Sequence, residues 1–515
     1  MANTQLFDTR SAGLPMADAR NAAGAPAYAL APKHQLAQLA MTGCLNHTFY
    51  ADAKAQLDDV LVLAKQLDDE WIARTAVYCR EKGHMKDMAA LLLAVLAVRR
   101  SPLLAVVFGR VIDSGKMLRN FVQILRSGMV GRKSLGTRPK KLVQQWLNTA
   151  TEAQLLSASV GNQPSLADVV RMMHPKPAES WRAAFFAWLI GKPFDMQALP
   201  PATRDLLAFR QNGGELPKVP FLLLSNEALN AQQWAQLAQQ MSWQSLRMNL
   251  NTLARHGAFG IDGVAQHVAS RLADVQAVAK ARAYPYQLLA AYRMTDSGIP
   301  QQVRNALQDA LEVSLRNVPK LAGKIVVCPD VSGSMSSPVT GYRQGATSAV
   351  RCIDVAALLA AAILRKHEDA RVMPFENRVV GIDLNPRDSV MTNAQRLAAI
   401  GGGGTNCSAP LAQLVREGAQ LDVLILVSDN QSWLDPQRCG ATATMQQWEL
   451  LRRRNPGARL ICIDIQPYGT TQAQEREDIL NVGGFGDAVF DVISQFAIGQ
   501  FAAMHWVEAI AATQL

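Results

Sequence analysis

The chain is 515 residues long, too long for a single hydrophobic core, so we expect at least two domains. Hydrophobic residues make up 49% and aromatic residues 6%, a composition typical of a soluble globular protein, and we identify neither a transmembrane helix nor a signal peptide. The seven cysteines are scattered without a CxxC pair, which favours reduced thiols over disulfides or a zinc site and predicts a cytoplasmic protein.

The excess positive charge lies in the N-terminal part of the chain. Residues 321–515 contain 16 Lys and Arg and 19 Asp and Glu, a net charge of −3. The first 320 residues therefore contain the remaining 36 basic and 23 acidic residues, a net charge of +13. Such an excess favours a polyanionic partner, of which nucleic acid is the commonest in the cytosol. A basic surface that serves only solubility is the alternative.

Residues 1–320 are predicted to form an all-α domain. From about Lys33 to Val318, apolar residues recur three and four apart, and Pro, Gly and Asn separate the segments at the spacing of helix pairs. Successive helices joined by short links favour a HEAT-like α-solenoid, although no repeat is regular enough to fix its period.

The densest basic region of this half spans residues 110–141, where Asp113 is the one acid. Its central part is a loop broken by glycine and proline that leads into a helix. Basic groups at a helix N-terminus suit phosphate, because the first backbone N–H groups add to the side-chain charge. A solvated charged face is the other interpretation. The candidates for phosphate contact are Arg132, Lys133, Arg138, Lys140 and Lys141.

A second polar cluster follows at residues 165–177. Ser165 and Asp168 have the spacing of a capping box that begins a short helix. Arg171, His174 and Lys176 lie near its end. A lone histidine is usually structural, but one flanked by cations can stack on a base or contact phosphate.

Residues 321–515 are predicted to form a doubly wound α/β domain. Continuous apolar strands alternate with helices, which implies a parallel sheet covered on both faces, with ligands at the carboxyl ends of the strands. The expected strands cover 323–330, 420–429 and 458–467, with a strand pair over 370–384. The expected helices cover 346–367, 442–454 and 491–510.

Three loops of this domain carry the pattern of a metal site. A DxSxS motif follows the first strand, a run of four glycines precedes a threonine, and an aspartate follows a later strand. One carboxylate with neutral oxygens suits a hard cation such as Mg²⁺. Each loop alone could be a turn, a flexible linker or a helix cap. The predicted ligands are Asp330, Ser332, Ser334, Thr405 and Asp429.

The same loops argue against catalysis. Hydrolysis at a metal ion requires an activated water with a general base beside it, or a second metal. The three loops contain neither His nor Glu. We therefore expect no enzymatic activity, and a metal-dependent nuclease is the least favoured reading.

The motifs in both halves resemble those of one known family. The three loops are similar to the metal-ion-dependent adhesion site of von Willebrand factor A domains, in which a partner's acidic side chain can complete the coordination of the metal. The helical half is similar to the TROVE module of the Ro autoantigen family, which precedes such a domain. The matching stretches are 42–51, 71–81, 140–146, 165–177, 246–257 and 280–292.

The resemblance implies a monomeric ring of helical repeats closed by the A-type domain. Single-stranded 3′ ends of misfolded RNA would pass through its basic hole, and structured RNA, including Y RNA or a bacterial equivalent, would bind outside. Relatives act as non-catalytic scaffolds in RNA quality control, and bacterial ones can partner an exoribonuclease. The further RNA candidates by motif are Arg247, Asn249, Arg255 and His256, and the departures from the family pattern are Pro139 and Pro175.

Two functional hypotheses follow. The first is a cytoplasmic, non-catalytic RNA-binding scaffold without a membrane association. The alternative is a metal-dependent protein-interaction module of the adhesion or chelatase-associated type, with the helical half as a docking solenoid. The charge of +13 in the helical half favours the first, because a protein clasp has no need of it.

Overall fold

The computed structural model of the chain describes residues 14–515, apart from 43–44, 49, 282, 284, 316–319, 343–349, 435–439, 485–491, 495, 498 and 500–504. The chain forms two compact units. One, the A-type unit, contains residues 1–56 and 315–507; the other, the helical unit, contains residues 57–314 and 508–515. The units thus combine segments from both ends of the chain, which a single division after residue 320 does not describe.

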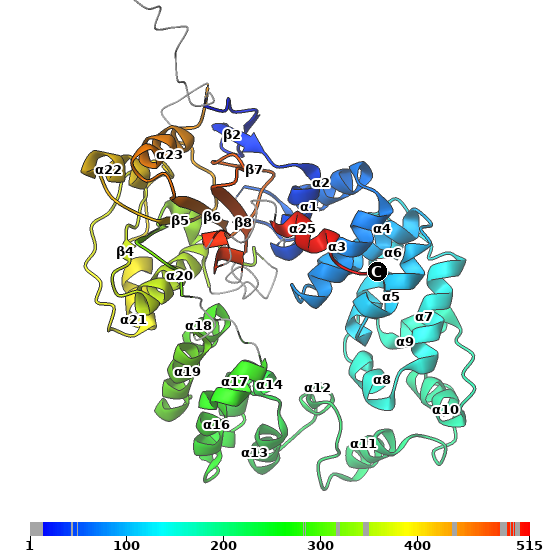
Figure 1. The fold of residues 1–515 in the computed structure, drawn as a ribbon. Helices are drawn as coiled ribbons and strands as arrows, with labels where there is room; N and C mark the ends of the chain where they lie inside the picture. The colour runs from blue at the N-terminus through cyan, green and yellow to red at the C-terminus, as the bar shows by residue number, and fades with distance from the viewer. Residues whose placement is uncertain are drawn as a thin grey trace, which may run out of the picture. The chain divides into compact units, whose positions relative to one another are not determined.

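The A-type unit contains a five-stranded parallel sheet with the strand order β4-β3-β5-β6-β8 (Figure 1). Its central strands are wholly buried because their sequences are almost entirely apolar. The five strands are β4 (Arg371–Val372), β3 (Ile325–Pro329), β5 (Val423–Ser428), β6 (Arg459–Asp464) and β8 (Ile479–Gly483).

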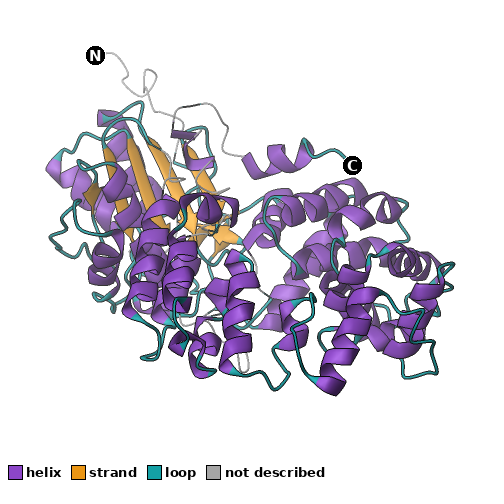
Figure 2. Cartoon of the chain, turned by 90° about the horizontal axis from the view of Figure 1, so that it is seen from below, coloured by secondary structure: helices purple, strands orange, loops and turns teal. Residues whose placement is uncertain are grey.

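Helices cover both faces of this sheet (Figure 2). On one face, Trp448 of α23 and Leu411 of α22 join Leu424 and Leu460 of the strands in one hydrophobic cluster. Helices α20 and α21 pack together, and α20 also contacts β3. This is the predicted doubly wound architecture. The helices are α20 (Cys352–Lys366), α21 (Val390–Ala398), α22 (Ala409–Glu417) and α23 (Ala443–Arg454).

The N-terminal segment belongs to the same unit. Strand β2 (Pro26–Ala29) pairs antiparallel with both β1 (Ala19–Arg20) and β7 (Thr470–Thr471). Helix α1 (Pro32–Thr42) packs against β8. Because β2 pairs with a strand more than 400 residues away, local sequence patterns do not reveal this contact. The segment is therefore assigned to the helical half from sequence alone.

Two sequence-based expectations for this unit are modified. The predicted strand pair over 370–384 is reduced to β4 and two isolated bridges of Phe375, one parallel to Asp330 and one antiparallel to Val379. The segment after Val379 alternates between half-buried and exposed residues without joining the sheet. In the predicted helix 491–510, residues 491, 495, 498 and 500–504 lie outside the described residues, residues 492–494 and 496–497 are helical, and the end coincides with α25 (His505–Ala511).

In the helical unit, described residues 57–314 contain helices and no strand. Sequence neighbours pack against one another, as α3 does with α4 and α18 with α19. This agrees with the predicted chain of helix pairs. The first helices are α2 (Ala53–Gln66), α3 (Asp69–Glu81), α4 (Asp87–Val98), α5 (Leu103–Val111), α6 (Gly115–Ser127), α7 (Thr137–Thr149), α8 (Glu152–Ser159), α9 (Leu166–Met173) and α10 (Ser180–Leu189).

The remaining helices follow the same rule, and several begin at a side-chain cap, as α13 does at Asn230. They are α11 (Pro201–Asn212), α12 (Phe221–Leu224), α13 (Ala231–Gln240), α14 (Trp243–Met248), α15 (Leu250–Arg255), α16 (Val264–Ala273), α17 (Val275–Ala281), α18 (Pro285–Arg293) and α19 (Gln301–Ser314). Among the described residues, no helix combines the length and apolar character needed to span a bilayer.

The described cysteines are buried thiols rather than disulfides, as predicted. They are Cys79, Cys328, Cys352, Cys407 and Cys462. Cys44 and Cys439 lie outside the described residues.

Candidate metal and nucleic-acid sites

The predicted metal ligands meet at one edge of the sheet in the A-type unit. Asp330 follows β3 directly and Asp429 follows β5 directly, and these two strands are parallel neighbours. Thr405 lies in the glycine-rich loop before α22. Because the carboxyl ends of parallel strands share an edge, the loops converge there.

Hydrogen bonds join the five side chains. The Thr405 hydroxyl donates to Ser332 Oγ at 2.9 Å, and Ser332 Oγ lies 3.4 Å from Ser334 Oγ. Ser334 in turn is hydrogen-bonded to the carboxyl group of Asp429. All five side chains are buried, and Asp330 and Ser332 have no exposed surface. The structure therefore brings together every residue that the three loops predicted.

Asp330 is held from two sides. Its Oδ1 accepts a hydrogen bond from the Ser332 backbone N–H at 2.8 Å, and its Oδ2 accepts one from Ser428 Oγ at 2.6 Å. Burial, followed by the negative charge of Asp429, raises the pKa of Asp330. Two buried carboxyl groups at one place ionise together only at a high electrostatic cost, which a divalent cation would offset.

The glycine loop is clamped to the DxSxS loop. The Gly402 N–H donates to Val331 O at 3.0 Å, and the Gly333 N–H donates to Gly403 O at 3.1 Å. Gly403 has a φ of +66°, and a Cβ there would collide with the Glu376 carboxylate. This contact explains a glycine at position 403, because another residue would displace the loop that presents Thr405.

Sequence reasoning missed three residues at this edge. Tyr50 is hydrogen-bonded to Ser334, and its ring packs edge-on against Tyr468 with centroids 5.6 Å apart. Asp464 ends β6 beside Ser428; burial and then the charge of Asp429 raise its pKa well above the usual range. Only Asp464 carried a signal, as an acid at the carboxyl end of a buried strand. Glu376 lies within the predicted strand pair over 370–384 but was not named as a site residue, and Tyr50 lies on a segment that the strand pattern does not place here.

The donor set fits a hard divalent cation. It consists of two carboxylates and three hydroxyls, the all-oxygen type that Mg²⁺ prefers. Among the described residues, no three His, Cys, Asp or Glu side chains form a metal-binding group. A metal ion at this edge would therefore depend on the hydroxyl oxygens.

The basic loop of the helical unit lies between α6 and α7. Lys133 and Lys141 are exposed and Lys140 is half-buried, and none of the three has a hydrogen bond or ion pair within the described residues. Gly136 begins α7 without a side-chain cap. Free backbone N–H groups and three lysines thus occur together. Pro139 does not interrupt this loop, because it is buried in the first turn of α7, where proline is tolerated.

The two arginines of this loop are structural as well as basic. Arg132 donates to Ala97 O at 3.2 Å, and Arg138 donates to Ser101 O at 2.9 Å, near the end of α4. Arg138 also donates to the carbonyl oxygen of Arg100, at 3.1 Å. Arg100 itself is exposed, with a φ of 59°, and adds a cation that sequence reasoning missed.

The second cluster surrounds α9. Ser165 and Asp168 form the predicted capping box. Arg171 is exposed and donates to Ile190 O at 3.0 Å, while Lys176 is exposed without a partner in the described part of the chain. His174 is exposed and ends the helix in the left-handed conformation, with its Nδ1 3.3 Å from Met172 O, and Pro175 then stops the helix from continuing.

The four weaker RNA candidates are not equivalent. Arg247 is buried and donates to Gln287 O at 2.7 Å, and Asn249 bonds Ser245 O within the same helix end, so both serve packing. Arg255 is exposed. The exposed His256 stacks on Trp234, with ring centroids 4.4 Å apart. A contact of Arg247 with RNA would require its guanidinium group to leave Gln287 O, and the contact stays a prediction.

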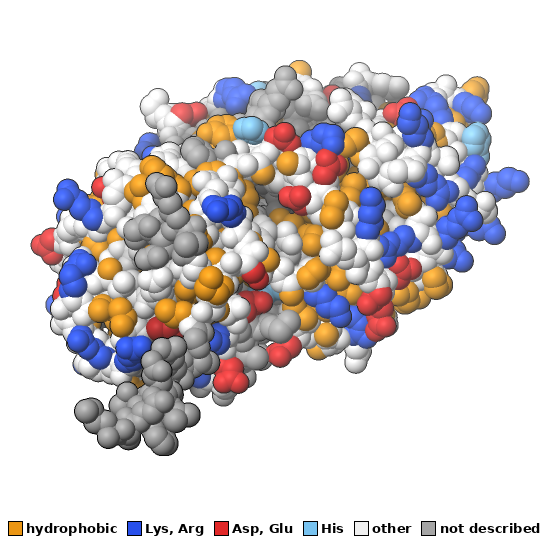
Figure 3. Space-filling view, turned by 90° about the horizontal axis from the view of Figure 1, so that it is seen from above, with side chains coloured by type: hydrophobic (Ala, Val, Ile, Leu, Met, Phe, Trp, Pro, Cys, Tyr) orange, Lys and Arg blue, Asp and Glu red, His pale blue; other side chains and the backbone are white. Residues whose placement is uncertain are grey.

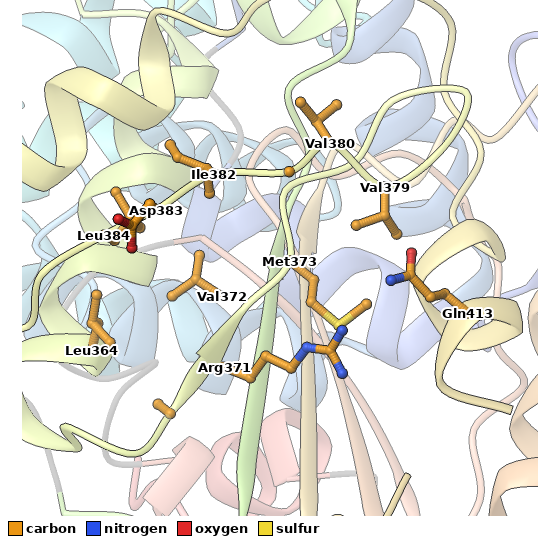
Figure 4. A pocket seen from close by; sticks show the side chains of 12 residues that line it. Leu364, Arg371, Val372, Met373, Val379, Val380, Ile382, Asp383, Leu384 and Gln413 are labelled. Carbon is orange, nitrogen blue, oxygen red and sulfur yellow. The ribbon is translucent and has the colours of Figure 1, made fainter. Parts of the chain in front are cut away.

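Lys and Arg side chains gather over the helical unit on the face drawn in Figure 3. A cavity of about 340 Å³ lies beside β4 in the A-type unit, where Val372, Ile382 and Leu384 line it (Figure 4). This cavity contains none of the predicted site residues.

Comparisons with known proteins show which proteins the chain resembles. The model of the Ro60 von Willebrand factor A domain matches residues 324–497. The RNA-binding protein RO60 of Deinococcus radiodurans is 24% identical over 93% of this chain and 95% of its own length. The chain is thus similar to an RNA-binding Ro protein over most of its length. The RNA-binding protein RO60 of Caenorhabditis elegans is 20% identical over 45% of this chain and 37% of its own length.

A solved structure agrees on the fold. The crystal structure of the Deinococcus radiodurans RO protein is similar over 92% of this chain and all of its own, with a TM-score of 0.65 and 21% sequence identity. The predicted fold, a helical module followed by an A-type domain of the Ro kind, is confirmed. Metal ligation and RNA contact by particular residues stay predictions.

Proposed function

We propose that this chain is a cytoplasmic, non-catalytic scaffold that binds Y-like small non-coding RNA and the single-stranded 3′ ends of misfolded RNA. The observation that carries the proposal is the set of exposed cations at the uncapped start of α7, where Lys133 and Lys141 have no partner in the described residues. Such a site suits phosphate. The names of the two relatives as RNA-binding proteins support the same class of ligand.

We further propose that Mg²⁺ binds at Asp330, Ser332, Ser334, Thr405 and Asp429. The protein would leave part of the coordination sphere open for an acidic side chain of a partner protein, such as an exoribonuclease. The five buried oxygen donors support this assignment. The closed monomeric ring implied by the family resemblance stays a prediction.

The test is binding of a structured RNA with a single-stranded 3′ tail, measured by filter binding over a series of salt concentrations. Each phosphate contact releases counterions, so affinity should fall steeply with salt. The double variant Lys133→Glu with Lys140→Glu should bind at least about tenfold more weakly at low salt.

The matched control is Lys192→Glu with Lys218→Glu. These two lysines are also exposed in the helical unit, and the variant has the same net charge. If both double variants lose affinity equally, the basic loop has no special role. If the unaltered protein does not bind RNA at low salt, the proposal is wrong.

The alternative, a metal-dependent protein-interaction module, is favoured by the metal loops and by the half-exposed Trp433 beside them (49% exposed). This alternative predicts that the chain binds a partner protein in the presence of Mg²⁺ and that Asp330→Ala abolishes this binding. It also predicts that the chain does not bind RNA. RNA cleavage that needs Mg²⁺ and Asp330 would instead indicate a nuclease.

A further inference from the structure

A polar cavity of about 500 Å³ opens on the A-type unit among α22, α23 and the turn after β4. Val379 and Gln413, which line the cavity of Figure 4, line this one as well, so the two cavities share a wall. Most residues that line this second cavity carry an amide, hydroxyl or guanidinium group. We call it the arginine pocket, defined by Asn377, Arg378, Asn406, Ser408, Arg416 and Gln447.

The arginine pocket has the charge of an anion site. No Asp or Glu occurs among its lining residues. Arg378 and Arg416 are exposed, and neither forms an ion pair within the described residues. The nearest acid in sequence, Glu417, is instead bonded to Arg371 at 3.0 Å and to Gln413 at 2.8 Å. Both arginines thus line the pocket without a direct ion pair in the described residues, while the Glu417 carboxylate, bonded to the lining residue Gln413, interacts with Arg416 through its charge.

The side-chain oxygens of the two asparagines in the pocket already accept hydrogen bonds within the protein. The Asn406 side-chain oxygen accepts from the Ser408 N–H at 3.2 Å and from the Ser408 hydroxyl at 2.7 Å. The Asn377 side-chain oxygen accepts from the Gly404 N–H at 2.8 Å. A ligand would therefore meet N–H groups of Arg378 and Arg416, which match a carboxylate in charge and geometry.

The pocket and the metal loops are continuous. Asn406 directly follows the predicted ligand Thr405, and Asn377 holds the glycine loop through Gly404. The Trp433 ring lies against Gly404 between them, since a Cβ at Gly404 would meet Trp433 and Asn377. An extended ligand attached at Thr405 would find an exposed aromatic side chain and then two arginines.

We propose that the arginine pocket receives an acidic side chain of a protein partner whose other carboxylate completes the metal coordination. This inference rests on one part of the proposed function, the binding of Mg²⁺ at the metal loops. A protein segment is favoured over RNA because Trp433, which is 49% exposed, lies between the metal loops and the pocket. An exposed tryptophan is also a frequent anchor at protein interfaces.

The probe is a fluorescein-labelled hexa-aspartate peptide, with a hexa-asparagine peptide for comparison, measured by fluorescence anisotropy in millimolar Mg²⁺. The full chain should bind the first and not the second. Arg378→Gln with Arg416→Gln should weaken binding by about tenfold or more. The control Arg387→Gln with Arg453→Gln removes the same charge from exposed residues of the same unit that do not line the pocket and should leave binding unchanged.

Three outcomes overturn the proposal. Equal losses in the two double variants would show attraction to net positive charge alone. A loss of RNA affinity in the pocket variant, with peptide binding intact, would assign the pocket to RNA. Binding that persists without Mg²⁺ or with Asp330→Ala would separate the pocket from the metal. Failure of the proposed RNA function is seen independently, in the RNA assay of Lys133→Glu with Lys140→Glu.

Discussion

The metal loops of the A-type unit and the basic loops of the helical unit use polar residues in opposite ways. Asp330 is completely buried, and the oxygen atoms around it bond to one another and to backbone N–H groups. Lys133, Lys141 and Lys176 are exposed and have no partner in the described residues. The metal loops therefore form a small set of atoms held in place by hydrogen bonds, whereas the basic loops present separate charges.

This difference determines how each site should respond to change. In a buried constellation, removal of one member leaves the others unsatisfied, so the effect should be large and local. Exposed cations contribute to phosphate binding one at a time and through a screened field, so each loss should be small and dependent on salt. The predictions below compare the two regions in these terms.

The largest effect is expected for Asp330→Ala. Because Asp330 joins the DxSxS loop to Ser428, its loss should weaken Mg²⁺ binding by about 100-fold or more. Isothermal titration calorimetry of the metal-depleted chain measures this, with the exposed Asp383→Ala as the control. RNA affinity should be unchanged in both variants. A metal affinity close to that of the unaltered chain would remove Asp330 from the site.

The next largest effect is expected for Arg247→Ala. This substitution tests whether a buried basic residue of the helical unit stabilises the fold rather than binding RNA. Loss of its bond to Gln287 O at 2.7 Å should lower the free energy of unfolding by about 2 kcal/mol. Urea unfolding measures the change. Arg255→Ala, at an exposed position on the neighbouring helix, should leave stability within about 0.5 kcal/mol. If Arg247→Ala instead weakens RNA binding without loss of stability, Arg247 is a contact after all.

The metal edge could be predicted from the sequence because its geometry follows from topology. Asp330 and Asp429 each end a buried strand, and parallel strands bring their carboxyl ends together whatever the loops do in detail. The same logic applies to Asp464, which was overlooked. It does not extend to Tyr50, since nothing in its local pattern indicates that the N-terminal segment pairs with β7 and reaches the metal loops.

The basic candidates were predicted less well because charge alone does not reveal exposure. Arg247 looks as basic as Lys141 in the sequence, but one packs under α18 and the other faces solvent. Arg132 and Arg138 prove to hold carbonyl groups at the end of α4. The helical fold itself could be predicted, because apolar residues recur every three to four positions whether or not the individual basic residues are exposed.

A smaller effect is expected for Lys141→Ala. If this lysine contacts one phosphate, the slope of log affinity against log salt should become shallower by about 0.7 to 0.9, and affinity at low salt should fall about threefold to tenfold. Arg132→Ala should change the slope less and stability more, because Arg132 bonds to Ala97 O. Equal changes in slope for the two variants would mean that Arg132 leaves its carbonyl partner to bind RNA.

The smallest effect is expected for His174→Gly. His174 adopts the left-handed conformation, with φ 52° and ψ 57°, which glycine adopts without steric cost. The substitution should therefore leave the free energy of unfolding unchanged or raise it by about 0.5 kcal/mol, as urea unfolding would measure. RNA affinity should nevertheless fall if the exposed ring stacks on a base. His174→Asn, which also tolerates this conformation, controls for backbone freedom. A gain in stability without any loss of RNA affinity would make His174 a helix cap alone and would confine the RNA contacts of this region to its cations.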